Sequence, residues 1–246
     1  MQSGASVASI CVETGFRAES LILRMETKDA VLTDLSVNEI FYSIQGESSR
    51  AGEPCVFVRL TGCGLRCAWC DTEYAFYEGS QMTIAEVMER VAEHNCKFVE
   101  LTGGEPLEQE TAFPLMTALC DAGYAVSVET GGHIDISRVD TRVCRIVDLK
   151  CPGSMMEKKN RWENVPYLTK NDEVKFVIAD ERDYAWAKEK MYHYHLHERC
   201  GCVLFSPVFG VMDNLQLSEW ILRDNLPVRF QVQLHKYIWE PNTRGV

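Results

Sequence analysis

Three cysteines in one short loop have the clearest chemical meaning in this chain of 246 residues. Cys63, Cys67 and Cys70 have the spacing C-x3-C-x2-C and directly follow the apolar run of residues 55–60. A structural zinc site takes four ligands, usually as two separated pairs, and the chain has no second C-x2-C pair. Three thiolates can instead hold a four-iron cluster and leave one iron without a protein ligand. The loop therefore predicts a metal centre with an open position; three buried thiols, or a zinc ion with a distant fourth ligand, are the alternatives.

The other eight cysteines are expected to be structural. Most stand singly within apolar runs, where a cysteine usually behaves as a small buried hydrophobic residue. A disulfide framework is not expected, because residues 1–24 lack the positive start and apolar core of a secretory signal. These eight are Cys11, Cys55, Cys96, Cys120, Cys144, Cys151, Cys200 and Cys202.

Composition favours an ordinary globular protein that acts on a small molecule. The chain is 46% hydrophobic and 25% charged, and its formal net charge of −11 argues against broad binding to nucleic acid. No run approaches the ~18 apolar residues of a membrane span, so we expect a cytoplasmic protein without a membrane partner. Residues 1–30 show little periodic pattern. We expect a flexible N-terminal extension there, with Met25 as the natural start, ahead of one domain over residues 31–246.

Alternating strand and helix patterns predict an α/β fold. Strands are expected over residues 37–44, 55–60, 97–101, 124–129, 144–150, 173–178, 202–206 and 228–234. Helices are expected after a capping box formed by Thr83 and Glu86, and around residues 113–120, 184–191 and 214–223. The connections 130–141 and 151–171 carry no helical period, so helices are fewer than strands. We therefore predict one incomplete, TIM-like barrel on a parallel sheet.

Polar residues follow nearly every expected strand. In barrels of this kind active groups gather at the carboxyl ends of the strands, so these residues are expected to share one pocket. They are Gln45 and Glu47, the cysteine loop, Gly103–Gly104–Glu105, Glu129 and Thr130, Asp148 to Lys150, Ser206 and His235.

The cysteine loop resembles that of the radical S-adenosylmethionine (SAM) enzymes. In that family an aromatic residue precedes the third cysteine, as Trp69 does here, and the open iron binds the methionine moiety of SAM. Reductive cleavage of SAM then releases a 5′-deoxyadenosyl radical. The sequence Gly103-Gly104-Glu105-Pro106 resembles the family's GGEP-type element, in which glycines let the backbone reach the cofactor.

A narrower resemblance runs from about residue 37 to residue 236. The segments Phe41-Tyr-Ser-Ile-Gln-Gly-Glu47, Cys70-Asp-Thr72, Glu129-Thr-Gly131 and Gln233-Leu-His-Lys236, with Arg59, are similar to the 7-carboxy-7-deazaguanine synthase family. This resemblance implies ring contraction of 6-carboxy-5,6,7,8-tetrahydropterin to 7-carboxy-7-deazaguanine, with loss of ammonia, on the route to queuosine. It also implies a [4Fe-4S] cluster, SAM, Mg²⁺, a homodimer and an electron donor such as a flavodoxin.

The resemblance assigns residues to each ligand. The pterin would contact Ile44, Gln45, Gly46, Glu47 and Arg59, with Thr102, Glu129 and His235 facing it as catalytic residues. SAM would lie against Trp69, Cys70, Asp71, Gly104, Glu105, Asp148, Leu149, Lys150 and Ser206. The cluster would be held by Cys63, Cys67 and Cys70, and Thr72 would offer its hydroxyl to Mg²⁺. Without the resemblance, Thr72 is simply a loop threonine.

Two positions depart from the family pattern. Ser48 stands where the family usually has glycine, and the tail after Lys236 is longer than usual, so the role of a terminal carboxylate is not transferred to Val246. Two other functions stay open: a glycyl-radical-enzyme activase, which shares the cysteine spacing, and a non-catalytic iron–sulfur protein. The run His193-x-His195-x-His197 is expected to be a solvated helix end rather than a metal site.

Overall fold

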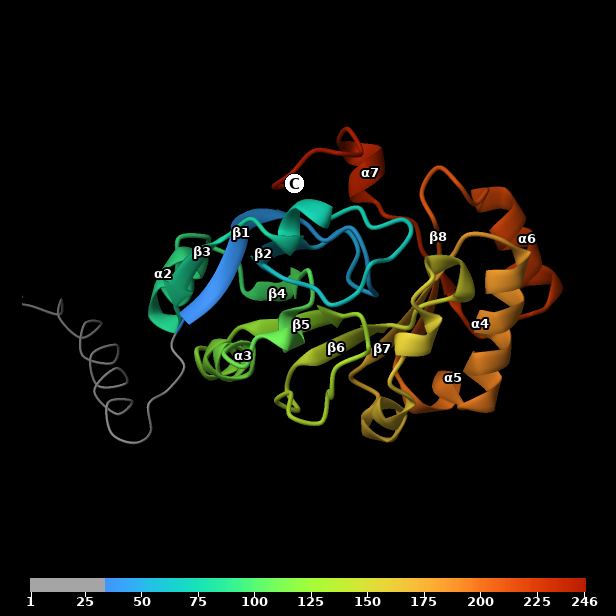
Figure 1. Cartoon of the computed structure of the whole chain (residues 1–246), viewed down its shortest axis with the longest axis horizontal. Helices are drawn as coiled ribbons and strands as arrows, with labels where there is room; N and C mark the ends of the chain where they lie inside the picture. Colours follow the sequence, from blue (N-terminus) through green and yellow to red (C-terminus); the bar gives the residue numbers. More distant parts are fainter. Residues whose placement is uncertain (1–33) are drawn as a thin grey trace, which may run out of the picture. The chain divides into compact units, whose positions relative to one another are not determined.

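One nine-stranded sheet organises residues 34–246, the part of the chain that the computed structural model describes (Figure 1). The strand order is β3-β1-β2-β4-β5-β6-β7-β8-β9. The strands are β1 (Asp34–Ile44), β2 (Pro54–Leu60), β3 (Ser80–Thr83), β4 (Phe98–Gly103), β5 (Ala125–Thr130), β6 (Cys144–Asp148), β7 (Glu173–Ile178), β8 (Cys202–Pro207) and β9 (Arg229–Phe230). From β2 to β9 all neighbours pair in parallel.

Within residues 34–246, six α-helices accompany the nine strands, which confirms the predicted partial barrel with fewer helices than strands. Helices α4 and α5 pack beside β7 and β8, and α3 packs beside β5 (Figure 1). The predicted capping box is present, since the Thr83 hydroxyl and the Glu86 carboxylate each accept a backbone N–H from the other residue. The helices are α2 (Ile84–Ala92), α3 (Ala112–Asp121), α4 (Glu181–His193), α5 (Leu196–Arg199), α6 (Asn214–Arg223) and α7 (His235–Ile238). Short 3-10 turns are η1 (Glu73–Phe76), η2 (Pro106–Glu108), η3 (Pro152–Ser154), η4 (Glu157–Lys159) and η5 (Trp162–Tyr167).

The two faces of the sheet differ in chemistry. On β7, Val174, Phe176 and Ile178 are fully buried in the apolar core that the helices cover. The alternating residues Glu173 and Lys175 point to the other face and are also almost fully buried. This second face is therefore a buried polar surface, and it forms one side of the candidate site.

Two predictions about the sheet were wrong in part, and one strand was missed. β1 is antiparallel to β2 and β3, so the sheet is not wholly parallel. The strand expected over residues 228–234 is reduced to the two residues of β9, and His235 begins α7 instead of following a strand. β3 was not predicted; its four residues are polar or half-exposed and carry no apolar run that would indicate a strand.

The predicted extension over residues 1–30, with Cys11 and Met25, lies outside the described residues, and the predicted domain boundary stays a prediction. Within residues 34–246, no helix combines the length and the apolar character needed to cross a membrane.

Candidate functional site

A cavity of about 500 Å³ lies against the polar face of the sheet. Its lining comes from the cysteine loop, the strand ends of β4, β5, β6 and β8, the loop after β1, and the C-terminal segment. All predicted site residues line it except Leu149, whose side chain packs in the apolar core. The residues brought together are Ile44, Gln45, Gly46, Glu47, Arg59, Cys63, Cys67, Trp69, Cys70, Asp71, Thr72, Thr102, Gly104, Glu105, Glu129, Asp148, Lys150, Ser206 and His235.

The cysteine loop forms one wall of this cavity. None of Cys63, Cys67 and Cys70 forms a disulfide, and burial raises the pKa of the Cys63 thiol to about 11 and that of the Cys67 thiol in the same direction. The Leu65 N–H points at the Cys63 sulfur, 3.4 Å away. Within residues 34–246, no three histidine, cysteine or acidic side chains are grouped to bind a single metal ion. Three thiolates on one short loop can each bind a different iron of a four-iron cluster and leave the fourth iron without a protein ligand, so the loop suits such a cluster.

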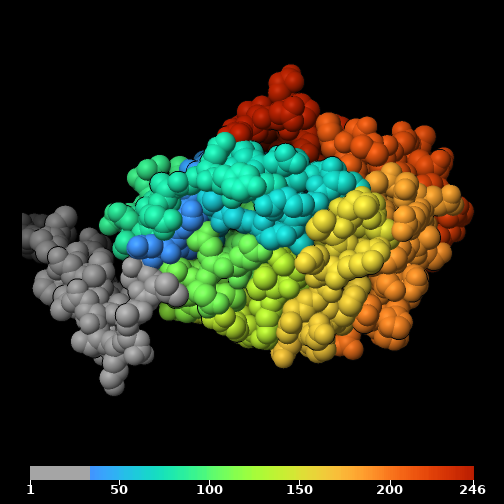
Figure 2. All heavy atoms as spheres, viewed as in Figure 1, coloured from blue at the N-terminus to red at the C-terminus, as the bar shows by residue number. Residues whose placement is uncertain are grey.

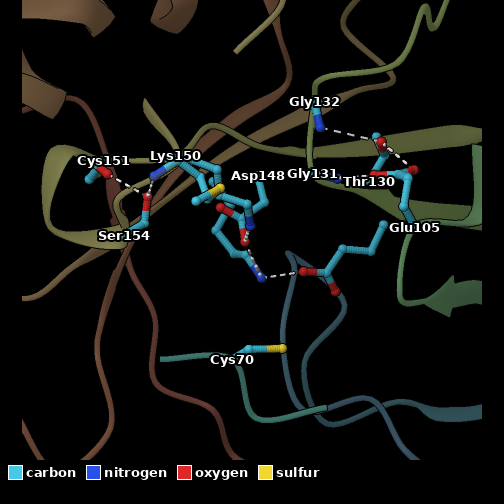
Figure 3. A network of polar contacts seen from close by, with 12 residues as sticks. Cys70, Glu105, Thr130, Gly131, Gly132, Asp148, Lys150, Cys151 and Ser154 are labelled. Atoms are coloured by element: carbon cyan, nitrogen blue, oxygen red, sulfur yellow. Dashed lines mark hydrogen bonds and ion pairs between the residues drawn. The ribbon is translucent and has the colours of Figure 1, made fainter. Parts of the chain in front are cut away.

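The glycine-rich turn after β4 packs directly on this loop. The Glu105 N–H donates to the Gly62 carbonyl at 2.7 Å, and a Cβ on Gly104 would lie 1.8 Å from the same oxygen. Only glycine permits this approach. The Glu105 carboxylate is fully buried and accepts hydrogen bonds from the Thr130 hydroxyl and the Gly131 N–H, at 2.8 and 2.7 Å (Figure 3). It therefore ties the end of β4 to the end of β5, beneath the cysteines.

Lys175 is the centre of the opposite wall. Its ammonium lies 2.7 Å from Glu47 and 3.6 Å from Asp148, and it also bonds Glu129. Burial alone would lower the pKa of Lys175, but these carboxylates raise it well above its ordinary value. Asp148 also pairs with Lys150 at 2.9 Å, and both line the same cavity as Cys70 (Figure 3). Two cations thus stabilise a group of three carboxylates in a confined space.

The carboxyl groups around Lys175 differ in their protonation. Burial raises the pKa of Glu47, but the Lys175 ammonium, the Gln233 hydrogen bond and His235 together outweigh this effect, and the net pKa is lowered. For Glu129 burial dominates over Lys175, and its pKa is raised. Burial, reinforced by the Glu129 charge, raises the pKa of Glu100 to about 8. The site therefore combines an ionised carboxylate with carboxyl groups that retain protons more readily.

The loop after β1 reaches the cavity from the opposite edge of the sheet. β1 is antiparallel to β2, so Ile44 at the end of β1 pairs with Pro54 at the start of β2. Gln45 and Glu47 therefore lie at the amino ends of the parallel strands and not at their carboxyl ends, contrary to our prediction. Gln45 donates to Glu100 at 2.6 Å. A Cβ on Gly46 would lie 2.0 Å from the His235 ring, so glycine is required for the histidine to enter the site.

The loop also explains one departure from the expected pattern. Ser48 has φ of 62°, a left-handed conformation that favours glycine. Its N–H donates to the Gln231 side-chain oxygen at 3.0 Å, and its carbonyl accepts from the Gln231 amide at 2.5 Å. The two bonds hold a serine in a backbone conformation that usually needs glycine.

Arg59 and Thr72 border the cavity beside the cysteine loop. The Arg59 side chain pairs with Glu39 at 2.8 Å, and its guanidinium lies 5.8 Å from each of the Phe41 and Tyr74 rings. Thr72 precedes η1, but its hydroxyl does not cap that turn, and it lies 3.8 Å from the Cys70 sulfur. Thr72 therefore lines the cavity directly beside the third cysteine.

Comparison with known proteins decides the family. No family model matches the chain. Over 216 residues it is 50% identical to the 7-carboxy-7-deazaguanine synthase of Chlorobaculum tepidum, covering 86% of this chain and 97% of that protein. The chain belongs to the 7-carboxy-7-deazaguanine synthase family. The Koribacter versatilis synthase is 43% identical over 226 residues, covering 86% of this chain and all of that protein.

Membership makes the chain a lyase of the radical SAM type, with SAM and an iron–sulfur cluster as its cofactors. The crystal structure of QueE from Escherichia coli has the same fold, with a TM-score of 0.68 and 22% identity over 82% of this chain and 95% of that chain. The partial barrel predicted from the sequence is therefore confirmed by the strand arrangement and by this likeness.

Sequence reasoning missed two charged residues of this synthase-family site. Lys175 and Glu100 lie in the interior of β7 and β4, away from the strand ends where site residues were sought. A signal was present, since a buried strand that alternates Glu-Val-Lys-Phe-Val-Ile must bury its charges along with its apolar residues. Buried charges require partners, which would have pointed to Glu47 and Glu129.

The C-terminal tail also reaches the cavity. The tail residues Pro241, Asn242 and Val246 line the cavity, although no role was assigned to them. The tail is fastened by Arg244, which pairs with Glu78 at 2.8 Å and covers the Tyr74 ring at 3.8 Å. His193 and His195 are exposed and the helix ends between them, as expected for a solvated helix end. His197 departs from that expectation, because its side chain is half-buried and its Nδ1 atom is buried.

Proposed function

We propose that this protein converts 6-carboxy-5,6,7,8-tetrahydropterin to 7-carboxy-7-deazaguanine with loss of ammonia, in the pathway to queuosine and related 7-deazapurines. The observation that carries the proposal is the cavity itself. The cysteine loop forms one wall, and a buried set of hydrogen-bonding and titratable groups around Lys175 forms the other. A reaction that uses a radical and also moves protons needs both walls within reach of one substrate.

The first wall suits SAM. When bound at the cluster, SAM supplies a carbon radical that can remove a hydrogen atom from the substrate. Trp69, Asp71, Gly104, Glu105, Asp148, Lys150 and Ser206 lie around the cysteines at the strand ends. The Gly104 backbone can approach the cofactor closely because it has no side chain, and the Asp148–Lys150 pair offers one acceptor and one donor group. Leu149 can contribute only its backbone there.

The second wall suits the pterin. Gln45, Glu47 and Glu129 offer acceptors for the N–H groups of a pyrimidine ring, and Ile44, Gly46 and Thr102 shape the floor of the cavity. Arg59 can bind the substrate carboxylate through the guanidinium N–H groups that Glu39 does not use. His235 is neutral, because burial lowers its pKa, and it can donate or accept a proton. Glu129, whose pKa is raised, is suited to deliver a proton to the departing nitrogen.

Mg²⁺ completes the proposed ligand set. Thr72 would be its only protein ligand, because a hard cation commonly keeps water and substrate oxygens as its remaining ligands. The support for Thr72 is its position between the cluster loop and the substrate wall, with a hydroxyl that does not cap η1. We further propose that the protein works as a cytoplasmic homodimer and receives its electron from a carrier such as a flavodoxin.

The test is product formation by the anaerobically reconstituted protein. With SAM, a reductant, the carboxytetrahydropterin and Mg²⁺, the deazaguanine should accumulate, and omitting Mg²⁺ should lower the rate. The C6–H isotope of the substrate should also appear in recovered SAM, because the cofactor is expected to be regenerated. Cleavage of SAM without any deazaguanine would reject the proposed substrate and favour an activase, which would need a partner protein instead.

A further inference from the structure

A basic and partly apolar patch borders the outer side of the cysteine loop. It consists of Arg66, Tyr77, Met155, Lys158 and Lys159, all exposed. Arg66 lies inside the loop, between Cys63 and Cys67, whereas Lys158 and Lys159 belong to η4, far away in the sequence. None of these residues lines the cavity.

Direct contacts hold the two parts of the patch together. The Arg66 N–H points at the Met156 sulfur, 3.4 Å away, and the Ala68 N–H donates to the Ser154 carbonyl at 3.1 Å. The Arg66 guanidinium stacks over Phe76 at 4.3 Å and lies 3.5 Å from the Tyr77 hydroxyl. Figure 2 shows the cysteine-loop region in cyan next to the segment around η4 in yellow, on one face of the molecule. The patch therefore lies beside the backbone that carries the cysteines.

The patch is basic, although the chain as a whole is acidic. The formal net charge is −11, and many exposed arginine and lysine side chains pair with a carboxylate, such as Arg138 with Glu110 and Arg244 with Glu78. Among residues 34–246, Arg66, Lys158 and Lys159 form no ion pair. The same holds for Lys97, Lys170, Arg182, Arg199 and Arg229, so the feature that distinguishes the three patch cations is their common position beside the cysteine loop. Glu157 is the acidic residue of the same turn. Unpaired cations on an otherwise acidic protein create a local positive field that can attract an acidic partner.

The apolar members of the patch have the features of a contact surface. Tyr77 is 80% exposed and Met155 is 74% exposed. Met155 also has φ of 64°, a left-handed conformation that is uncommon for a residue other than glycine. Tyrosine, methionine and arginine are the types enriched at protein interfaces, and methionine adapts its shape to a partner. Nothing within the described fold covers either side chain.

We propose that this patch is the docking surface for a small acidic one-electron carrier protein of the flavodoxin kind. The proposal rests on the proposed function, because only a reductively started reaction needs such a partner. The inner side of the cysteine loop faces the cavity, so a protein donor must approach the cluster from outside. One electron would pass from the flavin hydroquinone of the carrier to the cluster, which leaves a flavin semiquinone on the carrier. Charge complementarity would speed the encounter of the two proteins.

The test compares two reductants on a charge-reversal variant. The variant is Lys158→Glu with Lys159→Glu, and its matched control is Lys97→Glu with Arg229→Glu, which makes the same change of charge at two exposed positions that also form no ion pair. With reduced flavodoxin at low ionic strength, the patch variant should form product about 10-fold more slowly than the control. With dithionite, both variants should match the unaltered protein. The flavodoxin difference should shrink as salt is added, because added ions screen the attraction.

Equal rates for the two variants with flavodoxin would overturn the proposed surface, as would a patch variant that is equally slow with dithionite. If no deazaguanine forms under any reductant, the proposed function fails, but the docking surface can still be judged. Cluster reduction by flavodoxin, followed by the loss of its visible absorbance, then takes the place of product formation with the same two variants.

Discussion

Replacement of Lys175 by methionine tests whether the buried cation holds the substrate wall together. Lys175→Met keeps most of the side-chain volume and removes the charge that Glu47, Glu129 and Asp148 share. The Lys175 side chain is only 4% exposed, so water cannot take the place of the ammonium. Lys150 remains 2.9 Å from Asp148, but Glu47 and Glu129 lose their cationic partner.

The expected cost follows from this geometry. Removing one partner of a buried ion pair typically costs about 3–5 kcal/mol, because the remaining charge stays buried and uncompensated. Without Lys175, burial raises the pKa of Glu47 and Glu129 in the folded variant above the value that these groups have in the unfolded chain. The folded state can then lower the cost by protonating one of the two carboxylates. A carboxyl whose pKa is raised on folding favours the folded state as the pH falls. The deficit at pH 7.5 should therefore shrink toward pH 5.5, by at most about 1.4 kcal/mol per pH unit for each proton taken up.

Chemical unfolding at the two pH values measures this directly. Lys188→Met is the control, because Lys188 pairs with Asp224 at 2.8 Å but its side chain is 38% exposed. An exposed pair is worth about 0–1 kcal/mol, with little dependence on pH in this range. Product formation should be lost in Lys175→Met and kept in the control. A deficit for Lys175→Met that is below about 1 kcal/mol and equal at both pH values would refute the interpretation.

Three other predictions concern single side chains of the site. Thr72→Ala should weaken activation by Mg²⁺ roughly 10-fold or more while iron content stays unchanged, and Thr72→Ser should restore it; equal Mg²⁺ titrations would contradict the proposed ligand. Glu100→Gln should remove a pH dependence of unfolding. The folded protein retains the Glu100 proton up to pH 8 or so, whereas the unfolded chain loses it near 4.5, so the native protein should lose stability relative to the variant as the pH rises between those values, by at most about 1.4 kcal/mol per unit; parallel stability curves would refute the shifted pKa. Glu108→Ala should remove the carboxylate that accepts the Gly64 N–H at 2.7 Å, destabilising the loop between Cys63 and Cys67 by about 1 kcal/mol and hastening iron loss to a chelator. Glu108→Gln retains an acceptor and should lose iron at the native rate, and faster loss from the glutamine variant would point to charge rather than positioning.

Apolar patterning was enough to predict the parallel strands from β2 to β8, although not the short β9. β7 lies over residues 173–178 and α6 over residues 214–223, as predicted, because each has a clear apolar period and a defined start. The apolar pattern does not predict the direction of a strand, because an alternating pattern is the same in both directions. The antiparallel pairing of β1 follows from the short connection to β2. It places Gln45 and Glu47 at the amino ends of the parallel strands instead of their carboxyl ends.

The parts of the candidate site that consist of short contiguous motifs were predictable from the sequence, whereas the parts that depend on distant partners were not. The cysteine loop and the glycine-rich turn are contiguous in sequence, and each includes glycines that the observed backbone contacts require. Lys175 and Glu100 act through partners 128 and 55 residues away, at Glu47 and Gln45. Such contacts arise only when the sheet curves, so no local pattern contains them.

The C-terminal segment explains how an open sheet encloses the cavity. β9 has two residues, and in the described strand order the sheet ends at β3 and β9 without joining them. Gln233 closes part of the gap, since its amide donates both to Glu47 and to Asp71 at 3.0 Å. Lys236 adds an ion pair with Asp71 at 2.7 Å, and the Leu234 N–H donates to the Gly46 carbonyl at 2.9 Å. One segment thus fastens the substrate loop to the cysteine loop through side chains instead of strand pairing. Because Asp71 lies between Cys70 and Thr72, any movement of this segment must move the cluster wall and the proposed Mg²⁺ ligand together.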